Sequence, residues 1–141
     1  MRILGLDYGS KTLGVAVSDP FGWTAQGIET INRKDEKNLK STIARLGDII
    51  NEYNIEKIVL GLPKNMNNTS GERVDRTLYF KDRLMREFSI PVETWDERLS
   101  TIGAKRSLLE ADLSRKKQSK VIDKMAAVFI LQGYLDNLQR N

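Results

Sequence analysis

Apolar and polar positions along the chain divide it into strands and helices. Short apolar runs bounded by turn residues predict strands. The five predicted strands are Ile3–Asp7, Leu13–Asp19, Thr24–Ile31, Ile58–Leu62 and Ile90–Trp95. Apolar residues that recur at every third or fourth position predict amphipathic helices. The four predicted helices are Glu36–Glu52, Glu72–Phe88, Leu99–Glu110 and Ser119–Leu138.

The predicted helices also carry expectations about their ends and their buried faces. Asp35 precedes the first helix and is its expected N-cap, because an aspartate there can accept a backbone hydrogen bond from the first turn. In the second helix a set of apolar residues is expected to face the core. These residues are Val74, Leu78, Leu84, Met85 and Phe88.

The order of these elements predicts an α/β fold. Three strands in succession predict an antiparallel start, and the strands that alternate with helices predict parallel βαβ units. We therefore expect a mixed five-stranded sheet, with its first three strands antiparallel and helices on both faces. The length of 141 residues predicts one domain over residues 1–141. In such a sheet the usual ligand site lies beyond the carboxyl ends of the parallel strands.

Carboxylates follow two of the predicted strands at that edge. Asp7 ends the first strand beside Gly9, and Asp96 and Glu97 follow the last strand. A charge at the end of a buried strand is costly unless it is paired, bound to a metal or open to solvent. Asp7 is therefore a candidate ligand or a turn residue. An acid after the last strand is equally suited to capping the next helix, and the pattern alone does not separate Asp96 from Glu97.

A third carboxylate lies on the last predicted helix, which is apolar almost all round. At about 100° per residue, Ala126, Ala127 and Ile130 share the face of Asp123. This small apolar face is expected to press against the sheet and to bring Asp123 toward the other acids. The alternatives are a helix cap or an ion pair with a neighbouring lysine.

Composition narrows the chemistry, because the chain contains no cysteine and no histidine. Disulfides, thiolate or imidazole zinc sites and Ser-His-Asp triads are excluded, and a reducing cytoplasm is the expected location. Converging carboxylates repel one another unless a cation neutralises them. Oxygen ligands alone favour one or two Mg²⁺ or Mn²⁺ ions, which can activate water at a phosphate. No apolar run approaches the ~18 residues of a membrane span, so no membrane partner is expected.

Basic residues supply the second chemical feature, within a formal net charge of +4. Residues 114–124 hold five cations and one anion, which predicts either a solvated loop or a contact with a phosphate backbone. Further candidates lie in the first turn and in an asparagine-rich loop after the fourth strand. The candidate nucleic-acid ligands are Lys11, Asn65, Arg98, Arg115, Lys116, Lys117 and Lys120.

Taken together, the motifs resemble the YqgF-type family, whose members are described as Holliday junction resolvases and as pre-16S ribosomal RNA processing nucleases. The motifs that carry the resemblance are Leu6-Asp7-Tyr8-Gly9-Ser10-Lys11, Gly14-Val15-Ala16-Val17-Ser18-Asp19, Gly61-Leu62-Pro63, Asp96-Glu97-Arg98-Leu99-Ser100-Thr101 and Val121-Ile122-Asp123. The resemblance implies a ribonuclease H-like fold, a cytoplasmic location and a metal-dependent nuclease with Asp7, Glu97 and Asp123 as its acidic triad. Related resolvases carry an acid at the end of the fourth strand, where this chain has Gly61-Leu62-Pro63, so Glu97 would have to supply that ligand.

The favoured hypothesis is an endonuclease that hydrolyses phosphodiester bonds in structured nucleic acid. Processing of the 5′ end of pre-16S ribosomal RNA, with ribosome precursor particles as partners, is favoured over resolution of Holliday junctions. Branched DNA would require a homodimer with two active sites, whereas RNA trimming would permit a monomer, and no extended apolar stretch for dimerisation stands out. Two other classes stay open: a non-catalytic nucleic-acid or ribosome-binding adaptor, and an actin-like ATPase or sugar kinase. The latter is disfavoured because it clamps nucleotide between two domains.

Overall fold

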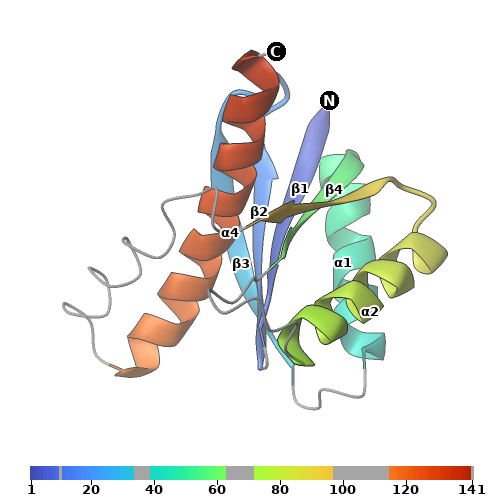
Figure 1. Ribbon diagram of the computed structural model, residues 1–141, viewed down its shortest axis with the longest axis vertical. Helices are drawn as coiled ribbons and strands as arrows, with labels where there is room; N and C mark the ends of the chain where they lie inside the picture. Colours follow the sequence, from blue (N-terminus) through green and yellow to red (C-terminus); the bar gives the residue numbers. More distant parts are fainter. Residues whose placement is uncertain (10, 34–38, 63–71, 97–114, 141) are drawn as a thin grey trace.

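The computed structural model describes residues 1–9, 11–33, 39–62, 72–96 and 115–140 (Figure 1). Its elements in chain order are β1 (Arg2–Tyr8), β2 (Thr12–Ser18), β3 (Ala25–Asn32), α1 (Lys40–Tyr53), β4 (Ile55–Leu62), α2 (Glu72–Glu87), β5 (Val92–Asp96) and α4 (Arg115–Arg140). The five predicted strands and three of the predicted helices are confirmed. The helix predicted over Leu99–Glu110 lies outside the described residues.

The strands form one mixed sheet in the order β3-β2-β1-β4-β5. The pairs β1–β2 and β2–β3 are antiparallel, whereas β1–β4 and β4–β5 are parallel. This is the predicted fold class. Strands β3, β1, β4 and β5 run in one direction, so their last residues lie at the same edge of the sheet. We call this edge, which comprises Asn32, Tyr8, Leu62 and Asp96, the carboxyl edge.

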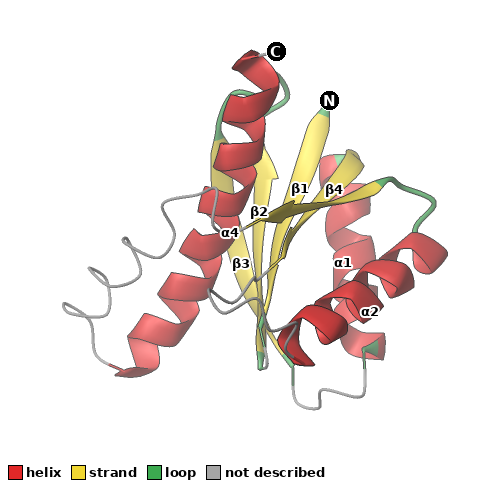
Figure 2. Ribbon diagram, viewed as in Figure 1, coloured by secondary structure: helices red, strands yellow, loops and turns green. Residues whose placement is uncertain are grey.

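Helices α1 and α2 cover one face of the sheet (Figure 2). Their apolar residues pack with Leu4 and Leu6 of β1 into the larger of two hydrophobic clusters. Helix α1 begins at Lys40, four residues later than predicted, and its N-cap position is Leu39, which makes no side-chain capping hydrogen bond. The prediction of Asp35 as the N-cap is therefore wrong, because the helix starts where its buried face begins, at Thr42 and Ile43, and not after the nearest acid.

The buried face of α2 agrees with the predicted one in part, because Leu84 is buried and Phe88 packs against the core as predicted. Phe80 and Leu84 are fully buried, whereas Leu78 is 41 % exposed and Met85 is 49 % exposed. The physical reason is the aromatic ring of Phe80, whose centroid lies 4.2 Å from that of the Tyr8 ring. Thr77, Phe80 and Leu84 recur at helical spacing and form one buried stripe. Leu78 and Met85 lie outside this stripe, so the prediction that they face the core is wrong.

Helix α4 covers the opposite face, across β1, β2 and β3, with its C-terminal end beside the N-terminus of the chain (Figure 1). The sheet offers it a row of small residues, since Gly5 pairs with Ala16 and Ala16 pairs with Gly27. A Cβ atom on Gly5 would lie 2.7 Å from the Leu131 Cβ and 3.2 Å from the Ala127 carbonyl oxygen. The helix therefore packs against the backbone of β1 itself.

Helix α4 begins at Arg115, four residues before the predicted start at Ser119. The basic stretch at 115–120 is therefore helical, and of the two alternatives for this stretch the loop is wrong. Arginine and lysine are good helix formers, and no glycine or proline interrupts this stretch. Among the described helices, none combines the length and the hydropathy that crossing a membrane requires.

Candidate active site

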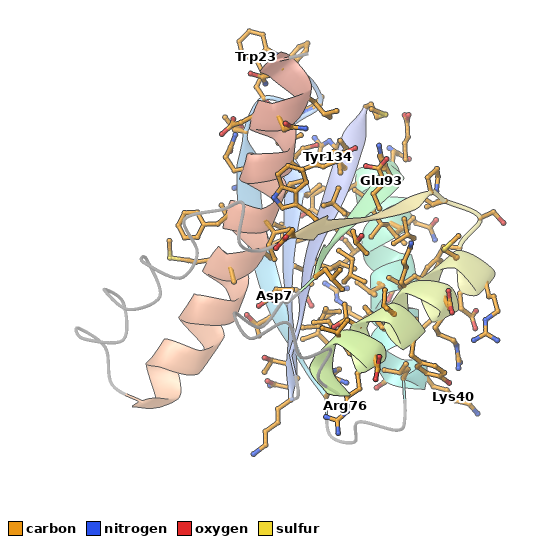
Figure 3. The ribbon with its side chains drawn as sticks, viewed as in Figure 1. Asp7, Trp23, Lys40, Arg76, Glu93 and Tyr134 are labelled. Carbon is orange, nitrogen blue, oxygen red and sulfur yellow. The ribbon has the colours of Figure 1, made fainter. Side chains whose placement is uncertain are left out.

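Asp7 lies at the carboxyl edge, on the face of the sheet that α4 covers (Figure 3). Side chains alternate along a strand, and Ile3 and Gly5 both pack against α4. Asp7 follows them at the same spacing, whereas Leu6 and Tyr8 belong to the cluster under α1 and α2. The Asp7 side chain is only 2 % exposed. A carboxylate buried this deeply calls for compensating polar or cationic groups.

The end of β5 contributes the neighbouring position on the same edge. Asp96 pairs with Leu62 of β4 and is half-buried. Trp95 packs into the cluster under α4, and its ring meets that of Tyr134 edge-on at 5.8 Å. Because neighbouring side chains in a strand point to opposite faces, Asp96 points away from α4 and away from the face of Asp7. Glu97 lies outside the described residues.

Position 123 belongs to α4, although its side chain lies outside the described residues. The expected packing face is confirmed, because Ala126, Ala127 and Ile130 are all buried against the sheet. Ala127 lies against Gly5. Helix α4 runs opposite to β1, so position 123, one turn before Ala127, lies toward the carboxyl edge. Along β1 the corresponding step from Gly5 toward this edge leads to Asp7.

Within the described residues, no group of three or more acidic side chains is close enough to hold a metal ion. The described residues include Asp7 and Asp96 but neither Glu97 nor the side chain of Asp123. The chemistry of the donors that are present fits a hard divalent cation. Asp7 offers buried carboxylate oxygens, and the chain contains no histidine or cysteine that would select zinc.

Several cations gather around the carboxyl edge. Lys11 is exposed in the turn between β1 and β2. Lys40 and Arg76 are exposed in the N-terminal halves of α1 and α2, at the same end of the molecule (Figure 3). These side chains make the edge suited to a polyanion.

For the other predicted nucleic-acid ligands, the structure describes either the backbone alone or nothing. Asn65 and Arg98 lie outside the described residues. Arg115, Lys116, Lys117 and Lys120 belong to the first two turns of α4, but their side chains are not described.

Sequence reasoning missed Lys40, Arg76 and the buried Arg33 at this edge. The order of the elements could have indicated Lys40 and Arg76, because each lies in a helix that follows a strand ending at the carboxyl edge. Arg33 follows β3 directly, and it is only 7 % exposed. Its contacts with the turn after Asp7 could not be read from the sequence.

A second polar cluster lies at the opposite end of the sheet and joins α4 to β4 and β5. The Lys57 ammonium donates a hydrogen bond to the Tyr134 hydroxyl and lies 3.2 Å from the Glu93 carboxylate. Burial raises the pKa of Tyr134, and the hydrogen bond with Tyr134 lowers the pKa of Glu93. Burial opposes the charge on Lys57, but hydrogen bonds to Tyr134 and Glu93 raise its pKa overall. The cluster is structural and fixes where α4 crosses the sheet.

The strand order and the helix packed across one face of the sheet define the ribonuclease H-like class of folds. Two solved structures share this fold. The structure titled "T. thermophilus RuvC in complex with Holliday junction substrate" matches with a TM-score of 0.63 and 14 % identity, covering 100 % of this chain and 97 % of that one. The yeast mitochondrial Holliday junction resolvase Ydc2 matches with a TM-score of 0.50 and 12 % identity, covering 94 % of this chain and 77 % of that one.

Sequence comparison identifies the family within this class. A family model named RuvX and described as Holliday junction resolvase matches residues 1–137. A protein of Oceanobacillus iheyensis is 60 % identical over 136 residues, which are 96 % of this chain and 98 % of that protein. A protein of a Geobacillus species is 59 % identical over 139 residues, which are 99 % of this chain and 100 % of that protein. Both carry the name "Putative pre-16S rRNA nuclease". The chain belongs to the RuvX family, the YqgF-type family expected from its motifs, and is a nuclease that acts on nucleic acid.

Proposed function

We propose that this nuclease is a metal-dependent endonuclease that trims the 5′ end of pre-16S ribosomal RNA during ribosome assembly in the cytoplasm. The observation that carries the proposal is the buried Asp7 carboxylate, 2 % exposed at the carboxyl edge and on the face covered by α4. The RNA substrate and the ribosome precursor as a partner are supported by the names of the relatives that match nearly the whole chain. Residues 1–141 would act as one nuclease domain.

The proposed metal ligands are Asp7, Glu97 and Asp123, holding one or two Mg²⁺ or Mn²⁺ ions. Asp96 points to the opposite face from Asp7, which favours Glu97 as the ligand from the end of β5. The path of α4 across Gly5 supports Asp123 as a ligand. Position 123 precedes Ala127 by one helical turn, and this turn lies toward Asp7. A bound divalent cation supplies an activated water and charge stabilisation for the leaving oxygen.

The proposed substrate contacts are the cations at the same edge. Lys11, Lys40 and Arg76 are exposed there, and lysine and arginine bind backbone phosphates without reading the base sequence. Asn65, Arg98 and the basic first turns of α4, with Arg115, Lys116, Lys117 and Lys120, would extend this contact. These groups orient the scissile phosphate against the acids and neutralise its charge.

A second candidate function is resolution of four-way DNA junctions, which the family description favours. A junction presents two strands to be cut, so this function would require two copies of the chain, whereas trimming of RNA proceeds with one. A non-catalytic adaptor is the third candidate.

The experiment compares wild-type protein with Asp7→Asn, using a pre-16S RNA with its 5′ extension and a four-way DNA junction. Asp48, an exposed acid on α1, provides the matched control Asp48→Asn. We expect wild type and Asp48→Asn to cut the RNA with Mg²⁺ or Mn²⁺ and not with EDTA. We expect Asp7→Asn to bind the RNA but to lose more than about a hundredfold in cleavage rate, since metal stabilisation of the transition state amounts to several kcal/mol.

Three results would contradict parts of this proposal. Undiminished cutting by Asp7→Asn would remove Asp7 from the metal site. Cutting of the junction in preference to the RNA would favour the resolvase. If wild type and Asp7→Asn bind the nucleic acids equally and neither protein cuts them, the adaptor is favoured.

A further inference from the structure

Arg33 is a buried arginine at the carboxyl edge, with only 7 % of its surface exposed. Arginine is almost never buried unless its charge is compensated, because removing a guanidinium from water is expensive. Among the residues that the structure describes, no carboxylate forms an ion pair with Arg33. The guanidinium instead contacts the two residues that follow Asp7.

Each of these contacts is to the end of β1 or to the turn after it. Nη1 donates a hydrogen bond to the Tyr8 hydroxyl at 2.8 Å, and Nη2 donates one to the Gly9 carbonyl oxygen. The Arg33 backbone N–H donates to the Lys11 carbonyl oxygen at 2.8 Å. The guanidinium carbon also lies 4.1 Å from the centroid of the Tyr8 ring. A planar fork of donors can hold two acceptors and stack on a ring at once, which a lysine cannot do.

The turn held in this way is closed from its other side as well. The Gly9 N–H donates to the Thr12 carbonyl oxygen at 2.9 Å. Phe80 packs on Tyr8 with a centroid distance of 4.2 Å, so the Tyr8 ring contacts both Phe80 and Arg33. Tyr8 faces α1 and α2, whereas Asp7 faces α4. Arg33 therefore binds the residues next to Asp7 from the face of the sheet opposite to the Asp7 side chain.

We propose that Arg33 is a positioning residue of the nuclease, which fixes the turn between β1 and β2 so that Lys11 meets the scissile phosphate beside Asp7. The inference rests on the proposed role of Lys11 in substrate binding. Arg33 itself does not touch the substrate and acts through the Gly9 carbonyl group and the Tyr8 hydroxyl group. A purely apolar side chain could fill the same space, but it could not set the direction of the Gly9 peptide.

The test uses Arg33→Lys, which keeps the charge but loses the fork, and Arg33→Met, which keeps much of the volume. The matched control is Arg45→Lys, because Arg45 also donates from two nitrogens, to the Glu29 carboxylate, on the outer surface of α1 and β3. The first readout is amide hydrogen exchange at Gly9, which requires no substrate. We expect exchange at Gly9 to be at least about tenfold faster in both Arg33 variants and unchanged in Arg45→Lys, because local opening controls exchange.

The second readout is the kinetics of RNA cleavage, alone and combined with Lys11→Ala. We expect Arg33→Lys to lower kcat at least about tenfold with KM nearly unchanged, because small misplacements of a positioned group reduce the chemical step. In the Lys11→Ala background the same change is expected to cost less than about threefold, because the group that Arg33 positions is already absent. Arg45→Lys is expected to leave kcat and KM unchanged.

Unchanged exchange at Gly9 in a folded Arg33→Lys protein would overturn the inference whether or not the proposed function holds. Faster exchange with full additivity of the Arg33 and Lys11 changes would overturn the link to Lys11. If neither Arg33 variant folds, Tyr8→Phe decides, because it removes one acceptor and keeps the ring. Faster exchange at Gly9 in Tyr8→Phe supports the clamp, and unchanged exchange contradicts it.

Discussion

At the scale of single residues, the absence of side chains matters as much as their presence. Gly5 and Ala16 let α4 approach the sheet, and a Cβ on Gly5 would meet the Leu131 Cβ at 2.7 Å. This close approach brings the first half of α4 to the face on which Asp7 lies. Gly5 therefore contributes to the candidate site by letting α4 pack closely, although it has no side chain that could bind a metal or a substrate.

Gly5→Ala is expected to lower the free energy of unfolding by about 1–3 kcal/mol, the usual cost of overpacking. It is also expected to reduce cleavage more than binding, because α4 must move away from Asp7. Gly47→Ala is the matched control. A Cβ there would meet Phe88 at an ordinary 3.5 Å, and alanine is expected to stabilise α1 by about 0.5–1 kcal/mol through its helix propensity. Urea denaturation measures both, and a Gly5→Ala protein as stable as wild type would contradict the packing described.

At the scale of elements, α4 is held at two ends of the sheet by different means. Near the carboxyl edge it depends on small residues and close packing. At the other end it depends on Tyr134, Lys57 and Glu93, where the hydrogen bond from Tyr134 and the ammonium of Lys57 lower the pKa of Glu93 below its ordinary value of 4.5. A carboxyl with a lowered pKa in the folded state stabilises the fold above its unfolded pKa. This stabilisation is lost as the pH falls through the folded value.

Glu93→Gln is expected to lower the free energy of unfolding at pH 7 by less than about 1 kcal/mol, because Glu93 is half exposed and solvent screens the pair. At a pH well below the lowered pKa of Glu93 the variant and wild type are expected to be equally stable, since wild-type Glu93 is then protonated. Glu56→Gln, an exposed acid on β4, serves as the control in the same urea titrations. An equal loss at both pH values would show that the charge of Glu93 does not hold α4.

The elements also show which features could be predicted from the sequence. The strands and the buried face of α4 could be predicted from local patterns. Ile3–Leu6 is a continuous apolar run, and Ala126 and Ala127 form the small apolar face that packs on the sheet. Asp7 could be chosen as a candidate for the same reason, since it ends a buried strand. The orientation of Asp96 could not be predicted, because it depends on Trp95 packing under α4.

Other features depend on contacts between distant parts of the chain. Phe80 turns α2 because it meets Tyr8, which is far away in the sequence. Arg33 is buried because the same Tyr8 ring lies beneath its guanidinium. Neither contact leaves a periodic signal, so the sequence predicted Leu78 as core and did not predict Arg33 at all. The start of α4 could not be predicted for another reason. The polar composition of residues 115–120 suits both a loop and the first turns of a helix.

At the scale of the whole molecule, the carboxyl edge carries several exposed cations. Lys11, Lys40 and Arg76 are exposed there, whereas Arg86 lies in the last turn of α2, away from that edge. A nucleic acid bound along the carboxyl edge would displace counterions in proportion to the phosphates that these side chains contact. Affinity for RNA should therefore fall with salt.

Lys11→Ala is expected to reduce the slope of log affinity against log salt concentration by about 1, the value for one lost phosphate contact. Arg86→Ala is expected to leave the slope unchanged. Fluorescence anisotropy in the Asp7→Asn background, in which we expect almost no cleavage, measures RNA binding alone. Equal effects of the two substitutions would mean that RNA does not follow the carboxyl edge.

Asp7, Glu97 and Asp123 are proposed to form one metal site at the carboxyl edge. A wild-type crystal soaked in Mn²⁺, with diffraction recorded at the manganese absorption edge, tests this site. We expect one or two anomalous peaks bound by all three carboxylates in the wild-type protein, and their loss in Asp7→Asn. A saturated crystal with no peak at Asp7, or with manganese bound only elsewhere, would contradict it.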